Sequence, residues 1–466
     1  MRKCRGSLEH LPPGLSAIRG EVLVLLLNTE TWFFLIPDPS KYPPPQNNFP
    51  HHSLGAISCS VIMFPAKICY LYALGKREFF PVKNRKTSMK NLQMVDLAGQ
   101  YRKIKPEVDK AVEAVMNSAA FIGGPAVGEF QKELESYLGV KHVIPCANGT
   151  DSLQIAMMAL GLKPGDEVIT PSFTYIATTE VIALLGLTPV FVDVDPKTFC
   201  IDATKIEAAI TPKTKAIVPV HLYGQSADMD AIMELAAKHN LFVIEDNAQA
   251  IGSDYHSASG KVSKVGTIGH IGSTSFFPSK NLGCFGDGGA LFTNDPDLAM
   301  KLKMVANHGQ RVKYNHEVIG CNSRLDTIQA AVLLVKLPLL DSYIDARRAV
   351  ADHYDRVLGA SEKIVIPFRD PKSKHVFHQY TVQLEGADRD GLQQYLAGHG
   401  IPSMIYYPAP AHKQGMFDSF GLGDLDLPVT EALTKKVISF PIHTEMDEEQ
   451  LSYICEHILA YVNQNA

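Results

Sequence analysis

The sequence has no excess of basic residues and no run of about 20 apolar residues, the length that a membrane-spanning helix needs. Its 466 residues include 44 Lys and Arg against 49 Asp and Glu, a formal net charge of −5. This balance gives no general attraction for nucleic acid or an anionic membrane, so a local pocket must hold any anionic ligand. The most apolar N-terminal stretches, near 22–36 and 58–74, are interrupted by Glu30 and Pro65. We therefore expect neither a nucleic-acid partner nor a membrane partner.

Paired cysteines are also lacking. The 8 cysteines are scattered, with no CxxC pair and no histidine at zinc-finger spacing. Neither a disulfide scaffold nor a structural zinc site is therefore indicated. The N-terminal apolar run is followed by no clear signal-peptide cleavage site. These absences predict a protein of the reducing cytoplasm that holds no metal.

Residues 1–88 differ in composition from the rest of the chain. They contain eleven Lys and Arg against five Asp and Glu, ten of the 29 prolines, and the only tryptophan, Trp32. Two interpretations remain open. The segment is a targeting or accessory extension, or it is upstream sequence translated from a misplaced start codon, with Met89 as the true first residue. The proline density and the absence of helical or strand periodicity favour the misplaced start.

The remaining sequence has the pattern of an α/β protein. From about 105 to 340, short β-branched runs alternate with longer amphipathic segments, which is typical of crossover units on a mostly parallel sheet. A long apolar-periodic stretch beginning SRLDTIQ at Ser323 leads to a second region with its own strand, VFHQYTVQL, and two helices. We predict a large α/β domain at 89–345 and a smaller C-terminal α+β domain at 346–466. The predicted strands of the large domain are 142–146, 167–171, 189–194, 216–222, 241–246, 273–277 and 289–294.

Two polar segments follow predicted strands of this sheet, where open α/β sheets bind their ligands. The turn ANGTDS (147–152) opens a helix and directs free backbone N–H groups at an anion such as phosphate. An ordinary helix cap would explain the same turn. Asp246 ends another buried strand, where its ionised carboxylate needs a cationic partner such as a protonated pyridine nitrogen. A helix N-cap is the alternative for Asp246.

A third segment places a lysine after a predicted strand. Lys280 follows 273–277 and precedes the loop NLGCFGDGGA, whose four glycines indicate backbone held closely against a neighbour. A lysine inside a cleft loses hydration, so its pKa falls and its amine can condense with an aldehyde. A solvated surface amine is the alternative for any single lysine. The chain order of phosphate turn, aromatic residue, Asp and Lys favours the cleft.

These segments together resemble one family, the DegT/DnrJ/EryC1/StrS sugar aminotransferases. The resemblance runs from about Gln93 to the C-terminus through FIGGPAVGEFQKEL, ANGTDSL, PSFTYIAT, PVHLYGQSADMD, IEDNAQAIG, STSFFPSKNLGCFGDGGA and GCNSRLDTIQAAVL. It implies a fold-type I transferase dependent on pyridoxal 5′-phosphate (PLP), with the seven-stranded sheet in the large domain. Nothing comparable covers residues 1–88.

The resemblance also implies roles for single residues around the cofactor ring. Lys280 would be the Schiff-base lysine and the catalytic residue, and Asp246 would pair with the ring nitrogen. Gln249 would contact the phenolic oxygen of the ring. Tyr175 would stack on the ring face, where an aromatic plane holds the pyridine by dispersion. A core aromatic is the alternative for Tyr175.

The cofactor phosphate is assigned on the same basis. Gly149, Thr150 and Ser275 would bind it within one subunit. Asn322 of the partner subunit would complete the site, so the resemblance implies a homodimer with shared active sites. A cap for the helix that begins with SRLDTIQ is the alternative for Asn322.

The expected reaction transfers an amino group from glutamate to a keto sugar on a nucleotide carrier, in amino-sugar or polysaccharide biosynthesis. The segment FFPSKNLGCFGDGG looks more like the corresponding segment of family members that act on 3-keto sugars than of those that act on 4-keto sugars. Candidate sugar contacts are Phe121, His308, Tyr407 and His412. Two alternatives remain: a PLP-dependent sugar dehydratase, against which Lys280 counts because that branch has histidine there, and a non-catalytic sensor with this fold.

Overall fold

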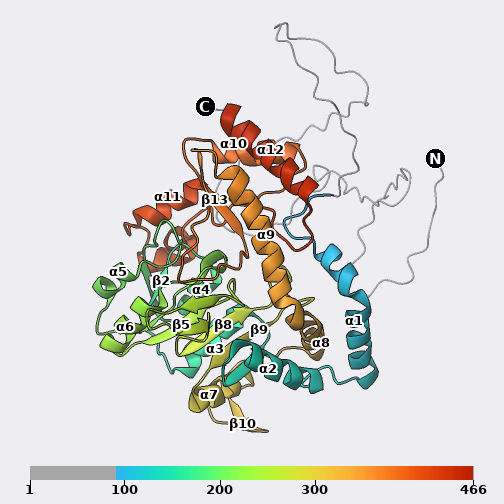
Figure 1. The fold of residues 1–466 in the computed structure, drawn as a ribbon. Helices are drawn as coiled ribbons and strands as arrows, with labels where there is room; N and C mark the ends of the chain where they lie inside the picture. The colour runs from blue at the N-terminus through green and yellow to red at the C-terminus, as the bar shows by residue number, and fades with distance from the viewer. Residues whose placement is uncertain (1–90, 465–466) are drawn as a thin grey trace, which may run out of the picture. The chain divides into compact units, whose positions relative to one another are not determined.

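Seven strands form one sheet in the computed structural model, which describes residues 91–464 (Figure 1). Residues 1–88, with their two interpretations, lie outside the described residues. Every neighbouring pair in the sheet is parallel except the two pairs that contain β9. The predicted mostly parallel seven-stranded sheet is therefore confirmed. In sheet order the strands are β1 (His142–Cys146), β9 (Gly289–Thr293), β8 (Ile271–Ser275), β5 (Phe242–Asp246), β4 (Thr214–Ile217), β2 (Glu167–Pro171) and β3 (Thr188–Val192).

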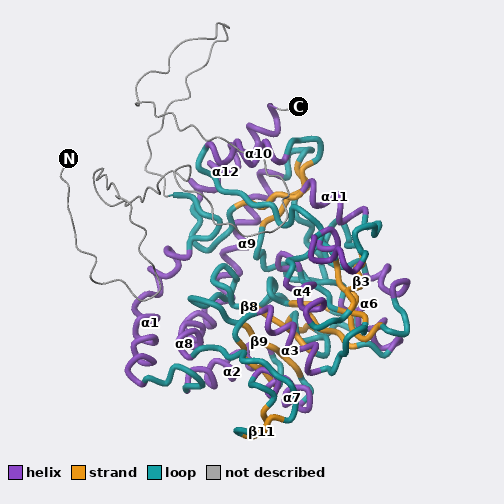
Figure 2. The backbone as a smooth tube through the Cα atoms, turned by 180° about the vertical axis from the view of Figure 1, so that it is seen from behind, coloured by secondary structure: helices purple, strands orange, loops and turns teal. Residues whose placement is uncertain are grey.

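Both faces of this sheet are buried. Successive residues of a strand point to opposite faces, and Val168 and Ile169 of β2 accordingly belong to two different hydrophobic clusters. Burial on both faces explains why these strands read as continuous apolar runs. Figure 2 shows strands in orange with helices around them. One cluster includes residues of α6 (Met229–His239), and the other includes residues of α3 (Gly149–Ala159), α4 (Ala177–Leu184) and α7 (Pro296–Ala306).

A group of four helices lies beside this sheet. Both α1 (Leu97–Ser118) and α2 (Pro125–Leu138) pack on α8 (Thr327–Lys336). The predicted long apolar stretch is divided by a short turn at Leu337–Leu339 into α8 and α9 (Leu340–Leu358), because Pro338 has no N–H to continue the ladder of α8. By length and composition Thr327–Leu358 could cross a membrane, but half of its most apolar window is buried. That burial is typical of a core helix.

The C-terminal region has its own antiparallel sheet and hydrophobic cluster. Helix α9 contributes Leu340 and Ile344 to a cluster with α2 and α8, and Tyr354 and Leu358 to the C-terminal cluster. In Figure 1 it runs from beside α8 to α10 and α12. The predicted boundary at 345 stays a prediction. The sheet consists of β12 (Ile364–Val365), β13 (Tyr380–Leu384) and β14 (Val437–Phe440), and the helices are α10 (Arg389–Gly398), α11 (Pro428–Lys436) and α12 (Glu448–Gln464).

Two short hairpins and several short turns complete the described elements. Neither hairpin was predicted, because strands of two or three residues leave no periodic pattern. The hairpins are β6 (Asp254–His256) with β7 (Val262–Lys264), and β10 (Gln310–Val312) with β11 (Asn315–His316). The turns are α5 (Ala203–Ile206), η2 (Glu207–Ala209), η3 (Leu222–Gly224), η5 (Ala411–Lys413) and η6 (Gly415–Phe420).

Candidate active site

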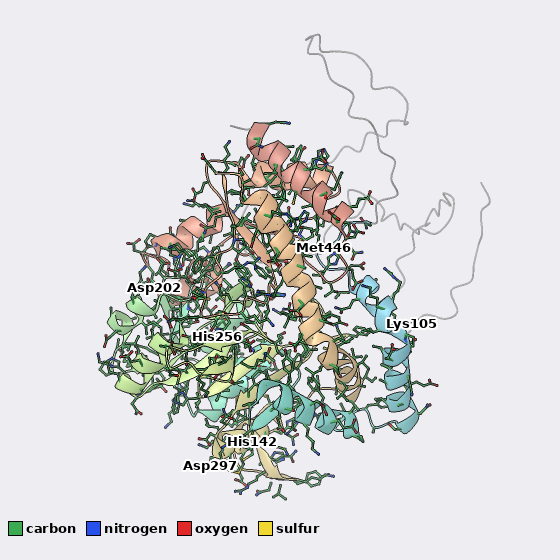
Figure 3. The ribbon with its side chains drawn as sticks, viewed as in Figure 1. Lys105, His142, Asp202, His256, Asp297 and Met446 are labelled. Atoms are coloured by element: carbon green, nitrogen blue, oxygen red, sulfur yellow. The ribbon has the colours of Figure 1, made fainter. Side chains whose placement is uncertain are left out.

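A pocket of about 810 Å³ lies at the carboxyl edge of the sheet. Its walls come from within residues 148–153, 174–178, 246–249, 275–280, 378–379 and 406–407, together with Val220 and Asp287. The opposite edge of the sheet is marked in Figure 3 by His142, the first residue of β1, close to Asp297 of α7. The pocket therefore occupies the edge at which open α/β sheets bind ligands.

One end of the pocket is built from the ends of β1 and β8. Cys146 and Ser275, the last residues of these strands, both pair with Gly289 of β9. The turn after β1 therefore lies beside Ser275. A Cβ atom on Gly149 would lie 2.7 Å from that of Ser275, so only glycine allows this approach. Gly149, Thr150 and Ser275 all line the pocket.

The same turn begins an 11-residue helix. Asn148 caps α3 by accepting a hydrogen bond from the Asp151 N–H at 2.8 Å. A helix N-terminus presents free N–H groups and a positive dipole end, which favour an anion. The turn is therefore the helix cap considered from the sequence, and its binding of an anion stays a prediction.

Asp246, the last residue of β5, lies in another wall of the pocket and is 5% exposed. Its Oδ1 accepts a hydrogen bond from the Ala248 N–H at 3.1 Å, and its Oδ2 accepts one from Thr178 Oγ1 at 2.7 Å. No helix begins after Asp246, so it is not a helix cap. Among residues 91–464 no basic side chain forms an ion pair with it. A buried carboxylate in this situation favours a ligand that brings a positive charge.

Lys280 lies on the loop after β8 and lines the same pocket. Burial lowers its pKa from the ordinary 10.5 to about 8, and attraction to Asp246 offsets only part of that shift. The loop is anchored beside it, because Asn281 Nδ2 donates to the Val376 carbonyl at 2.9 Å. A lysine with this pKa has a much larger neutral fraction near physiological pH than an ordinary lysine, so its amine can act as a nucleophile or a base.

A pair of tyrosines and an amide form the wall near Asp246. Gln249 Oε1 accepts from the Tyr223 N–H at 2.7 Å, and its Nε2 donates to the Tyr407 hydroxyl at 3.1 Å. The Tyr175 ring centroid lies 6.1 Å from that of Tyr407. Tyr175 is 57% exposed, so it is not a core aromatic, and its ring is free to stack on a ligand.

The other predicted contacts lie outside this pocket. Phe121, His308 and Asn322 are exposed. Asn322 forms a bridge with Asn307 and does not cap α8, which begins at Thr327. His412 is 1% exposed, and its Nδ1 lies 2.7 Å from Ser172 Oγ, so its ring faces Ser172 and not the pocket.

Several pocket residues were missed from the sequence. Thr178 lies three positions after Tyr175, within the segment PSFTYIAT that begins at the end of β2, and its place in that segment is the signal that could have found it. His378 and Gln379 come from the chain just before β13, and no local pattern marks them. Burial and the nearby Lys280 hold the pKa of His378 well below its usual value. Its carbonyl accepts a hydrogen bond from the buried Arg347 at 3.3 Å.

These features fit PLP. Its phosphate suits the N-terminus of α3, its pyridine nitrogen suits Asp246, its aldehyde suits the Lys280 amine, and its flat ring suits Tyr175. In particular, the unpaired buried carboxylate and the lysine of lowered pKa are both accounted for by this one group.

Comparisons with known proteins agree with this fit. The profile of the DegT/DnrJ/EryC1/StrS aminotransferase family matches residues 102–459. The chain is 47% identical over 373 residues to a pleiotropic regulatory protein of Geobacillus stearothermophilus, covering 80% of this chain and 98% of that protein. It is 45% identical over 364 residues to the UDP-2-acetamido-2-deoxy-3-oxo-D-glucuronate aminotransferase of Pseudomonas aeruginosa, covering 78% and 98%. The crystal structure of NtdA from Bacillus subtilis with bound cofactor PMP has a TM-score of 0.75, at 32% identity over 82% of this chain and 87% of that one.

Proposed function

This chain belongs to the DegT/DnrJ/EryC1/StrS aminotransferase family, and from that premise we propose that it moves an amino group from glutamate to a 3-keto group of a nucleotide-linked sugar. The family resemblance inferred from the sequence is confirmed, and the protein is a PLP-dependent nucleotide-sugar aminotransferase of fold type I. The observation that carries the proposal is a lysine of lowered pKa in one pocket with a buried carboxylate that forms no ion pair within residues 91–464. The name of the Pseudomonas relative, a 3-oxo sugar aminotransferase, supports the 3-keto preference.

Lys280 is the proposed catalytic residue. When bound, PLP supplies an aldehyde that captures amines and a ring that withdraws electrons. Lys280 would hold the cofactor in the resting protein, and its Nζ would be available for proton transfer once an amino donor is bound. The freed Nζ takes a proton from the α-carbon of glutamate, and in the second half-reaction it returns a proton to the sugar carbon. A pKa of about 8 suits a group that must alternate between these two protonation states.

The other pocket residues bind and orient. Asp246 pairs with the ring nitrogen, Tyr175 covers the ring face, and the Gln249 amide faces the phenolic oxygen while holding Tyr407. Gly149, Thr150 and Ser275 bind the phosphate. In this arrangement Tyr407 also lies where the sugar enters, since it shares the pocket with Lys280.

The proposed active form is a homodimer. Three side chains of the segment around β10 and β11 are exposed and apolar: Val312 at 64%, Tyr314 at 82% and Ile319 at 87%. A group of exposed apolar side chains is typical of an interaction surface. His308 and Asn322 flank this segment in the chain, which supports the proposal that a subunit docked through it contributes both residues to the pocket of the other subunit. Phe121 is proposed as a third contact of that kind.

Mixing inactive variants tests the shared site. Lys280→Ala and Asn322→Ala proteins, unfolded and refolded together, should form mixed dimers with one intact pocket and regain activity. Each variant refolded alone should stay impaired. If the mixture is no more active than the sum of its parts, each pocket is complete within one subunit and Asn322 has no role across the interface.

A cytoplasmic, biosynthetic role is proposed with the reaction. The described cysteines, Cys146, Cys200, Cys284, Cys321 and Cys455, form no disulfides among residues 91–464, which suits a reducing compartment. Amino sugars of surface polysaccharides or of small secreted products would be the end use.

A non-catalytic regulatory role is the second candidate, favoured by the name of the Geobacillus relative. Both candidates are tested by incubating the protein with PLP, glutamate and a panel of nucleotide-linked 3-keto and 4-keto sugars. The proposal predicts an amino sugar from a 3-keto substrate, seen by NMR, with equal amounts of 2-oxoglutarate. Neither product should form with Lys280→Ala. Binding of sugars with no product from any of them would favour the regulatory role.

A further inference from the structure

Thr178 contacts Asp246, and none of the roles above uses that contact. Thr178 is the second residue of α4 and is 1% exposed. Its Oγ1 lies 2.7 Å from Asp246 Oδ2, while the Ala248 N–H occupies Oδ1. Each oxygen of the carboxylate therefore carries one hydrogen bond from the protein, and only one of the two comes from a side chain.

The direction of these hydrogen bonds follows from the groups themselves. An ionised carboxylate can only accept, so Thr178 must donate its single hydroxyl hydrogen to Asp246. A second hydroxyl, Thr174 Oγ1, lies 3.1 Å from Thr178 Oγ1. Since the Thr178 hydrogen is already used, Thr174 must be the donor in that pair. The two hydroxyls form a directed chain that ends on Asp246.

We propose that Thr178 is a positioning residue that fixes the rotation of the Asp246 carboxylate against the ring nitrogen of the cofactor. This inference rests on the proposed function and extends it to a residue that acts through Asp246. Tyr175 lies on the same segment, between Thr174 and Thr178. One short piece of chain therefore presents a ring for stacking and also holds the carboxylate that faces the edge of the bound ring.

A neighbouring threonine provides a matched control. Thr179 is fully buried, but its Oγ1 donates to the Ile176 carbonyl at 3.0 Å, within its own helix. It does not line the pocket. Replacing either threonine by valine keeps the shape and removes one hydroxyl from α4. Only Thr178→Val removes a hydrogen bond from Asp246, so a difference between the two variants reports on the carboxylate and not on the helix.

Thr178→Val should leave folding and cofactor uptake intact and change the chemistry at the ring. We expect the half-reaction with glutamate to slow about tenfold, the scale of one hydrogen bond to a charged group. A ring nitrogen that holds its proton less firmly withdraws fewer electrons, so the visible band of the lysine-bound cofactor should titrate at higher pH than in the wild type. Thr178→Ser keeps the hydroxyl and should restore both properties to a large extent.

The experiment compares wild type, Thr178→Val, Thr178→Ser and Thr179→Val, each loaded with PLP. Three quantities are measured: the midpoint of thermal unfolding, the pH midpoint of the visible band, and the rate of band loss after glutamate is added. The inference requires that the band midpoint and the rate change in Thr178→Val alone. It is overturned if Thr178→Val behaves like the wild type, or if both valine variants lose rate and stability together. A wild-type band that does not respond to glutamate would contradict the proposed function itself, which is a separate outcome.

Discussion

The lowered pKa of Lys280 makes a quantitative prediction for the cofactor-free protein. Burial moves the pKa of this amine from 10.5 to about 8. At pH 7 the neutral fraction of the amine then rises from about 0.03% to about 10%, roughly a 300-fold increase. This increase corresponds to a free-energy difference of about 3 kcal/mol between the protonation equilibria of the two lysines. The neutral fraction should increase about tenfold per pH unit up to pH 7 and level off above pH 8 to 9. An ordinary lysine would continue to gain reactivity to beyond pH 10.

Labelling with trinitrobenzenesulfonate measures this directly, because the charge of that reagent is constant over the range. The rate for Lys280 is the difference between wild type and Lys280→Ala, which removes the contribution of all other lysines. Lys336 also has a pKa near 8, but it is 1% exposed and bound to the Gly283 carbonyl, so it should react slowly in both proteins. Asp246 raises the pKa of Lys280, so Asp246→Asn should move the midpoint to lower pH. A midpoint above pH 10 would show that burial does not lower the pKa of Lys280, and no shift in Asp246→Asn would show that Asp246 does not raise it.

Three further predictions concern the pocket and the segment behind it. Asp246→Asn should still take up PLP but slow the glutamate half-reaction by about 100-fold, because an amide cannot stabilise a protonated ring nitrogen. Stopped-flow absorbance measures this rate. A wild-type rate would exclude a pairing of Asp246 with the ring nitrogen. Gly149→Ala places a Cβ 2.7 Å from that of Ser275 and should weaken PLP binding about tenfold or more by titration. In the control Gly128→Ala, the new Cβ would meet no atom within 4 Å from elsewhere in residues 91–464, so PLP should bind normally. Arg347→Met leaves three buried carbonyls without this donor and should cost about 2–4 kcal/mol in urea unfolding; a loss below 1 kcal/mol would mean that water replaces the guanidinium.

The strands of the sheet could be predicted closely because each is a short apolar run between turn signals. The prediction for 142–146 and 167–171 matches β1 and β2 at both ends. The prediction for 216–222 extends past β4, which ends at Ile217. Beyond that residue the apolar run continues, but Val220 forms only an isolated bridge with Asp246. Hydrophobicity alone does not show at which residue a strand stops forming hydrogen bonds with its neighbour.

The pocket could be predicted only where its residues directly follow a strand. Asp246 and Lys280 are positioned by β5 and β8, so the alternation of strands and helices was enough to bring them together. His378 and Tyr406 reach the pocket from the C-terminal region, about 100 residues beyond Lys280. Their approach depends on how the two sheets pack, which no local pattern encodes. His412 was predicted to contact the sugar but does not line the pocket. Its position in the sequence does not show that its ring faces Ser172.

Lys280 is proposed to hold PLP in a pocket that accepts an amino group from glutamate. The most direct test is the absorbance spectrum of the purified protein with PLP, before and after glutamate, in wild type and Lys280→Ala. We predict a visible band in the wild type that glutamate removes, with release of 2-oxoglutarate, and no such band in the variant. A visible band of equal strength in Lys280→Ala would show that Lys280 does not hold the cofactor, and a wild-type band that glutamate leaves unchanged would show that glutamate is not the amino donor.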